Sequence, residues 1–446
     1  MAYWLAPVTG RRRDGFLKRF AAPFWTVDFP RPMMASVCTT GPDSLRVECS
    51  FYRQDDLAGL IWPSADRFDH TLLRYETARD FRRCTLRFRW RSAGVKALDV
   101  PYGPTLTIEG RDAEGAARTW LVRLWNYASG APEDAAVTLD FGALQAGFAP
   151  GGEAVFAGDI DRMFISLVAP GYTGAGAALA QAAHGWAELS EISCEGSGSV
   201  LAVGDVLVPE HALRIATGYD DLYHLTPERV LRNVLALGYR GVINHYVGMS
   251  HYFALGGDGK VDAGAALNGP CAAWHRDFAA RAQANGHELT WSLSYELLDQ
   301  HCPEGWKQRH EDGAPALTGW VPPSALLSPA NDAAMAYLQG VAAAFAGIAL
   351  EAGLRVRFQV GEPWWWVKDG ASACTMRRRW RGSRRRRSRM CGGRWGLGSW
   401  RLWTRRGRCW RSRRRICARR YGRLPRTRSV CCSPICRGCW MRRRRR

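Results

Sequence analysis

The last seventy residues of the chain, 377–446, contain no lysine, aspartate or glutamate. They hold instead 29 arginines, six tryptophans and seven cysteines. A segment selected to bind phosphates would mix lysine with arginine, because a phosphate contact needs charge and reach more than one particular cation. Arginine without lysine is typical of GC-rich DNA translated in the wrong reading frame. We therefore interpret residues 371–446 as a frameshifted, disordered tail, with nucleic-acid binding as the alternative if this segment is genuine.

Without this tail the chain has no excess of positive charge. Of its 62 basic residues 33 lie outside the last seventy positions, together with all 41 acidic residues. The net charge of this body is therefore about −8, whereas that of the whole chain is +21. The body lacks the basic character that nucleic-acid binding requires.

Long apolar runs and metal-binding spacings are also missing. No segment reaches the roughly eighteen uninterrupted apolar residues of a membrane span, and none precedes Arg11 as a signal peptide would. The seven cysteines of the body have no disulfide-framework spacing. Those of the tail lack the second pair or the histidine cluster of a zinc site. We expect buried thiols, no metal or other cofactor, no membrane span and no signal peptide.

Residues 1–205 contain short segments that alternate apolar with polar residues between Gly, Pro and Asp turns. In Cys84–Trp90 the side chains of Leu86, Phe88 and Trp90 fall on one face of a strand. Evenly spaced strands of this kind predict a β-sandwich. The other predicted strands are Thr105–Glu109, Trp120–Trp125, Ala136–Phe141 and Met163–Val168.

Residues 206–370 alternate strands with helices, which indicates a parallel βα array. One helix is expected to begin at Thr226 and Pro227, a capping residue followed by proline at the first helical position. Four βα units make half of a TIM barrel, so we expect an incomplete barrel. The predicted strands are Leu213–Gly218, Gly241–Val247, Glu288–Ser294 and Arg355–Val360, and the longer helices are Ala272–Asn285 and Asn331–Ala352.

Functional side chains of a barrel gather at the C-terminal ends of its strands. Glu362 follows the fourth predicted strand, beside Trp364 and Trp365, whose rings can stack on sugars. A carboxyl group enclosed by aromatic rings loses solvation. Its pKa therefore rises, and it can serve as a general acid. A glutamate that only hydrogen-bonds the backbone or an arginine is the alternative. Glu296 would be the second carboxylate that glycoside cleavage requires, or else one half of a structural ion pair.

Three further residues are candidates for binding a substrate. Asp220 follows the first predicted strand and can hold sugar hydroxyls, although acids in such loops are commonly solvated. His245 lies near the end of the second strand and can donate to a hydroxyl or exchange protons near neutral pH, with a structural histidine as the alternative. Trp291, in the third strand, supplies a further ring.

Four segments resemble the non-contractile tail sheath proteins of phages and prophages: Trp291–Glu296, Gly319–Ser324, Leu327–Ala330 and Gln359–Trp366. The resemblance implies a β-rich N-terminal domain, a TIM-barrel domain and a structural role in a virion tail. It also implies other tail proteins as partners, above all the tail tube, and a homo-oligomer that assembles in the host cytoplasm.

An enzymatic alternative rests on Gly361, Glu362 and Pro363, which are similar to the Asn-Glu-Pro of glycosidases that use a fourth-strand acid. Here Gly361 replaces the asparagine that would contact the sugar, and the nucleophile expected on a seventh strand is absent. We therefore favour a tail structural protein, with surface carbohydrate as a further contact, over a truncated glycoside hydrolase.

Overall fold

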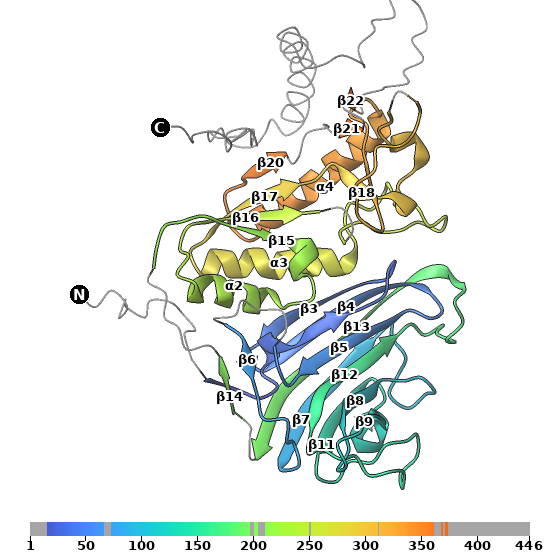
Figure 1. The fold of residues 1–446 in the computed structure, drawn as a ribbon, viewed down its shortest axis with the longest axis vertical. Coiled ribbons are helices and arrows are strands. Elements are labelled where there is room, and N and C mark those ends of the chain that lie inside the picture. The colour runs from blue at the N-terminus through green and yellow to red at the C-terminus, as the bar shows by residue number, and fades with distance from the viewer. Residues whose placement is uncertain are drawn as a thin grey trace, which may run out of the picture.

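The computed structural model describes residues 16–66, 73–196, 200–203, 210–248, 251–310, 312–360, 367–368 and 371–372. A β-rich part and an α/β part follow one another along the long axis of the molecule (Figure 1). The β-rich part extends to the strand β14, and the α/β part begins with β15. This order confirms the fold class predicted from the sequence.

Two antiparallel sheets form the β-rich part and enclose one hydrophobic core. The six-stranded sheet has the order β10-β11-β7-β13-β4-β3, and the five-stranded sheet has the order β2-β5-β12-β8-β9. A small third sheet has the order β1-β14-β6. The strands are β1 (Phe16–Lys18), β2 (Thr26–Asp28), β3 (Met34–Gly41), β4 (Ser44–Arg53), β5 (Leu57–Pro63), β6 (Tyr75–Glu76), β7 (Cys84–Ala93), β8 (Thr105–Arg111), β9 (Ala117–Arg123), β10 (Ala128–Ala131), β11 (Asp134–Asp140), β12 (Ile160–Val168), β13 (Ala178–Gly196) and β14 (Val200–Val203), with short 3-10 turns η2 (Ala22–Phe24) and η3 (Leu124–Tyr127).

The strand β7 shows how the sequence builds this sandwich. Leu86, Phe88 and Trp90 are buried, whereas Arg87 and Arg89 between them are exposed. The strand pairs with β11 on one side and β13 on the other, so its backbone is hydrogen-bonded along both edges. Burial of each large apolar side chain contributes roughly 1.5–3 kcal/mol. The alternation in the sequence therefore fixes which face of the sheet meets the core.

The α/β part contains a parallel sheet with the order β15-β16-β17-β20. Helices connect these strands, as the predicted βα pattern requires. The strands are β15 (Ile215–Gly218), β16 (Val242–Val247), β17 (Glu288–Leu293) and β20 (Phe358–Val360), and the helices are α1 (Tyr219–Leu222), α2 (Pro227–Ala236), α3 (Gly269–Ala284) and α4 (Asp332–Glu351).

Each long helix begins at a side chain that caps it. The side chains of Thr226, Asn268 and Asn331 accept hydrogen bonds from backbone N–H groups in the first turns of α2, α3 and α4. Pro227 occupies the first position of α2, as predicted. Such caps satisfy donors that a helix cannot pair internally, and each stabilises the helix by about 1 kcal/mol.

A long connecting segment separates β17 from α4. It contains an antiparallel ribbon of β18 (Glu296–Leu298) and β19 (Ser324–Leu326) and the 3-10 turns η4 (Asp299–His301) and η5 (Glu304–Trp306). A second ribbon pairs β21 (Val367–Lys368) with β22 (Ala371–Ser372).

In the part of the chain that the structure describes, one helix, α4, is long and apolar enough to cross a membrane by length and composition. One face of this helix is buried, however, and its Phe345 packs against Trp291 of β17 with ring centroids 5.4 Å apart. This is the arrangement of a core helix in a folded domain.

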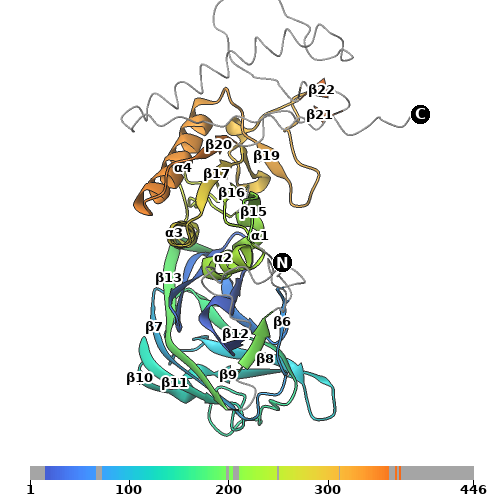
Figure 2. The same ribbon diagram turned by 90° about the vertical axis from the view of Figure 1, so that its left-hand side faces the viewer.

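The helices α2 and α3 lie between the parallel sheet and the β-sandwich (Figures 1 and 2). Met34 of β3 belongs to the same buried cluster as Trp274 and Phe278 of α3. The hydrophobic core of the α/β part thus continues into the edge of the six-stranded sheet.

Candidate functional site

The C-terminal ends of β15 and β16 bring Asp220 and His251 together. His251 Nδ1 lies 2.7 Å from Asp220 Oδ1, and His251 Nε2 lies 2.9 Å from Nη2 of Arg31. A guanidinium can only donate, so Nε2 must accept and the imidazole proton must sit on Nδ1, from which it is donated to Asp220. Asp220, a predicted site residue, is therefore engaged by a histidine and, through it, by an arginine of the β-rich part.

Aromatic rings enclose His251. Its ring stacks on Tyr223 with centroids 4.1 Å apart and meets Phe29 edge-on at 6.3 Å. Burial lowers the pKa of His251, and the hydrogen bond and charge of Asp220 oppose this shift only in part. The histidine is thus neutral at pH 7, as its contact with Arg31 requires.

His245 lies on the helix-facing side of the parallel sheet and is fully buried. Thr217 Oγ1 is 2.8 Å from its Nδ1, and His275 Nε2 is 3.2 Å from its Nε2. His275 Nδ1 is 2.7 Å from the carbonyl oxygen of Cys271 and must therefore donate. It follows that His245 donates from Nε2 to His275 and accepts from Thr217, so both rings are neutral and every ring nitrogen is satisfied.

The pKa values of these two histidines agree with this arrangement. Burial lowers the pKa of His245 well below its usual range and that of His275 to about 3. This position matches the structural alternative considered for His245 from the sequence.

Trp291 lies beside His245 on the neighbouring strand, with ring centroids 5.7 Å apart, and 1% of its surface is exposed. Side chains at paired positions of neighbouring strands point to the same face of a sheet, which here is the face that packs on α3 and α4. A ligand-binding role for His245 or Trp291 stays a prediction, and this position offers a ligand almost no exposed surface.

Glu296, which follows the third predicted strand Glu288–Ser294, lies in a separate strand. β17 ends at Leu293, and Glu296 begins the ribbon strand β18, opposite Leu326 of β19. Its side chain is 4% exposed. The predicted acid, Glu362, and the two predicted sugar-stacking residues, Trp364 and Trp365, lie outside the described residues.

An almost completely buried ion pair joins the α/β part to the β-rich part. Arg229 of α2 forms an ion pair of 2.6 Å with Asp66 of the β-rich part, and both side chains are almost completely buried. The guanidinium also lies over the ring of Phe24, 4.8 Å from its centroid. Thr226, the cap of α2, donates from its hydroxyl to the carbonyl of Pro23 at 2.6 Å.

A second, partly buried network holds α3 to β3. Arg281 of α3 pairs with Glu228 of α2 at 2.9 Å and donates to the carbonyl of Thr39 at 2.8 Å. The Thr39 hydroxyl donates to Glu228 at 2.7 Å. We call the contacts of Arg31, Asp66, Thr39 and Pro23 with the α/β part the domain interface. Sequence reasoning missed it, because no local pattern connects residues about 200 positions apart.

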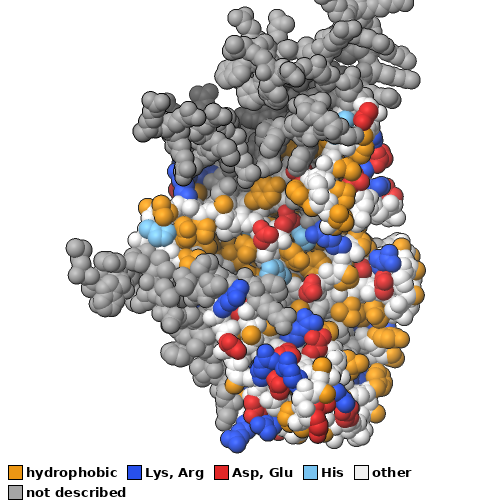
Figure 3. Space-filling model, in the orientation of Figure 1, with side chains coloured by type: hydrophobic (Ala, Val, Ile, Leu, Met, Phe, Trp, Pro, Cys, Tyr) orange, Lys and Arg blue, Asp and Glu red, His pale blue; other side chains and the backbone are white. Residues whose placement is uncertain are grey.

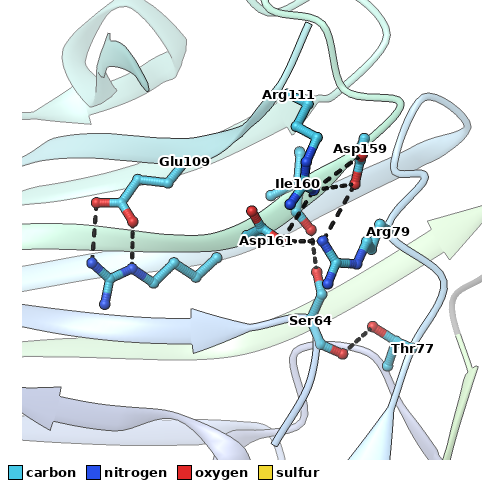
Figure 4. Close-up of polar contacts among 9 residues, drawn as sticks. Ser64, Thr77, Arg79, Glu109, Arg111, Asp159, Ile160 and Asp161 are labelled. Carbon is cyan, nitrogen blue, oxygen red and sulfur yellow. Dashed lines mark hydrogen bonds and ion pairs between the residues drawn. The ribbon is translucent and has the colours of Figure 1, made fainter. Parts of the chain in front are cut away.

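The outer surface of the β-rich part carries interspersed acidic and basic side chains (Figure 3). In one cluster Arg79 and Arg111 lie between Asp159 and Asp161 (Figure 4). Close by, Glu109 of β8 pairs with an arginine of β12. The acidic groups are therefore neutralised by arginines of the same surface.

Among the described residues, no group of three or more His, Cys, Asp or Glu side chains is placed to hold a metal ion. The polar clusters found in these segments connect parts of the protein to one another.

Several solved structures are similar to this chain at a very low level. A Bacillus subtilis protein named YXIM is 10% identical, with 78% of this chain and 82% of that chain covered and a TM-score of 0.18. The α-N-acetylgalactosaminidase NagBb from Bifidobacterium bifidum is 10% identical, with 78% and 68% covered and a TM-score of 0.21.

Two family models match the chain at the level of sequence. The model of the non-contractile tail sheath N-terminal domain matches residues 17–204, which comprise the β-rich part. The model of the TIM barrel of the non-contractile tail sheath protein matches residues 209–381, which include the parallel sheet. Both domains of one family therefore occur here in the expected order. The chain belongs to the family of non-contractile tail sheath proteins.

Proposed function

We propose that this tail protein is a building block without enzymatic activity, which lies in many copies against the tail tube. Membership of the family implies a place in the virion tail and assembly with other tail proteins. The tail tube as direct partner, and the host cytoplasm as the site of assembly, are the finer parts of the proposal.

The domain interface is the observation that carries this proposal. In a structural subunit the two domains should keep one relative orientation, without hinge motion. The Arg229–Asp66 ion pair is almost fully buried, with side-chain exposures of 0% and 1%. Such a pair holds one relative placement, because separating the two surfaces would leave a charge buried without a partner.

The arrangement at the strand ends supports the same proposal. Asp220 is held by His251, and the neutral His251 is held in turn by Arg31. These contacts fix the proton of His251 on Nδ1. The imidazole connects the two domains, because it donates to Asp220 and accepts from Arg31. Contact with surface carbohydrate rests on Trp364 and Trp365, outside the described residues, and stays a prediction.

The test is incorporation into particles. In a phage that encodes this chain, tails should contain the protein together with the tube, and Asp66→Asn should reduce its incorporation strongly. Glu195→Gln, in an exposed ion pair with Arg87 on the same sandwich, is the matched control and should assemble normally. Normal assembly of the Asp66→Asn protein would contradict the need for a rigid domain interface.

The enzymatic alternative is checked on the same material. Purified tails and purified protein should leave bacterial surface polysaccharide intact. Cleavage that Glu362→Gln abolishes would overturn the proposed role.

A further inference from the structure

A buried arginine in the β-rich part lacks a carboxylate partner among the described residues. Arg19 is 1% exposed, and its guanidinium donates to the carbonyls of Ala78 at 2.6 Å and Asp80 at 3.3 Å. Its cation also lies 3.9 Å from the ring centroid of Phe81. The Asp80 carboxylate itself is bound by Arg82 at the surface. A buried cation surrounded by neutral acceptors stabilises an anion that comes close to it.

The group that meets this cation is a thiol. Nη1 of Arg19 lies 3.6 Å from Sγ of Cys84, the first residue of β7. Cys84 also shares a hydrogen bond with the thiol of Cys194 on β13. This hydrogen bond, followed by the charge of Arg19, lowers the pKa of Cys84 to about 7 in spite of its burial. For Cys194 the same hydrogen bond raises the pKa. Because Arg19 contacts the sulfur of Cys84, Cys84 is the better placed of the two to ionise.

The register of the sheet explains why these two sulfurs meet. Cys84 lies opposite Gly196, and Cys194 lies opposite Leu86, so the cysteines are diagonal neighbours on paired strands. Gly196 has a φ of +100°, and a Cβ there would lie 1.7 Å from the carbonyl oxygen of Arg83. Only glycine therefore fits at the position opposite Cys84.

The pair also lies where the ladder ends. β7 begins at Cys84 and β13 ends at Gly196, so local opening of the strand ends can admit a small molecule and let the two backbones adjust. Cys49 of β4 provides an internal comparison: it is equally buried, but burial raises its pKa and no cation opposes this.

We propose that Cys84 and Cys194 form a peroxide-sensitive thiol pair, with Cys84 as the attacking thiolate and Cys194 as the resolving thiol. The Cys84 thiolate attacks one oxygen of hydrogen peroxide, the O–O bond breaks, and hydroxide leaves as Cys84 becomes a sulfenic acid. The Cys194 sulfur then attacks the Cys84 sulfur. The S–O bond breaks, the thiol proton leaves with the hydroxyl group as water, and a disulfide joins β7 to β13.

The experiment is peroxide oxidation of the folded full-length chain, followed by alkylation, digestion without reductant and mass spectrometry. We expect a Cys84–Cys194 disulfide to appear about tenfold faster than any oxidation of Cys49, because the thiolate is the reactive form. The rate should rise with pH around a midpoint near 7. In Cys194→Ser the sulfenic acid should persist at Cys84 and be trapped by dimedone.

Three results would overturn the proposal. Oxidation of Cys84 no faster than that of Cys49 in the unmodified protein would show that Arg19 does not activate it. A disulfide from Cys84 to another cysteine would exclude Cys194 as the resolving thiol. Dimedone labelling of Cys194 in the Cys84→Ser variant, without labelling of Cys84 in the Cys194→Ser variant, would reverse the assigned roles.

Discussion

Removal of one partner of the Arg229–Asp66 ion pair should destabilise the whole molecule. The two side chains are 0% and 1% exposed, and their charged groups lie 2.6 Å apart. In Asp66→Asn the guanidinium keeps its charge and its place over Phe24, but it loses the carboxylate. Breaking a buried pair in this way costs about 3–5 kcal/mol, since a buried charge is left without compensation.

The measurement is urea unfolding at pH 7, followed by circular dichroism, for Asp66→Asn, Arg229→Met and the double variant. Each single variant should lose about 3–5 kcal/mol. The double variant should lose clearly less than the sum, because no charge is left unpaired. We also expect the single variants to unfold in two steps, with the α/β part first, since the ion pair connects the two hydrophobic cores.

The control is Glu195→Gln, which removes an exposed pair with Arg87 and should change stability little. Additive losses in the double variant would refute the reasoning. They would mean that the two side chains stabilise the protein independently, through packing and not through their mutual charge.

Three further expectations follow from the described contacts. Trp90→Ala should cost about 3–5 kcal/mol in urea unfolding, because the ring is fully buried, whereas Arg89→Ala on the opposite face of β7 should change little; equal losses would contradict the assigned faces. Thr217→Val should cost about 1 kcal/mol by leaving His245 Nδ1 without its donor, and no loss would contradict the inferred proton positions. The free energy of unfolding should fall as the pH drops below about 6.5. In the folded state His275, with a pKa of about 3, and His224, with a pKa of about 4, stay neutral at this pH, whereas in the unfolded chain they bind protons. His275→Gln should weaken this pH dependence, and an unchanged slope between pH 7 and 5 would argue against it.

The sequence predicted elements well where one periodicity dominates. Leu86, Phe88 and Trp90 alternate with polar residues and form a strand with the expected buried face. Thr226 and Pro227 mark the start of α2 because a capping oxygen and a proline suit that position alone.

The long strand β13 was not predicted. Its first six residues, from Ala178 to Ala183, are rich in alanine, which favours helix in isolation. Pairing with β4 at Ala178 and Ala183 holds this segment extended, and β7 pairs with β13 only from Trp186 onward. Strand preference of this kind arises from neighbours in the sheet, which a single sequence does not show.

The faces of the parallel strands could not be assigned from the sequence. His245 and Trp291 were placed correctly on strands, but buried parallel strands are apolar on both sides, so the pattern does not tell the barrel interior from the helix layer. The partner of His251 was beyond reach for another reason. Arg31 lies 220 positions away, and only the packing of the two domains brings it there.

The cap of α2 has a consequence for the order in which the chain folds during synthesis. The hydroxyl of Thr226 accepts from the backbone of Arg229 and donates to the carbonyl of Pro23, and Arg229 reaches Asp66. Pro23 and Asp66 leave the ribosome long before Thr226 does. The folded sandwich is therefore a template for the first turn of α2, so in a ribosome-bound chain whose α2 has just left the exit tunnel this helix should already be protected from proteolysis.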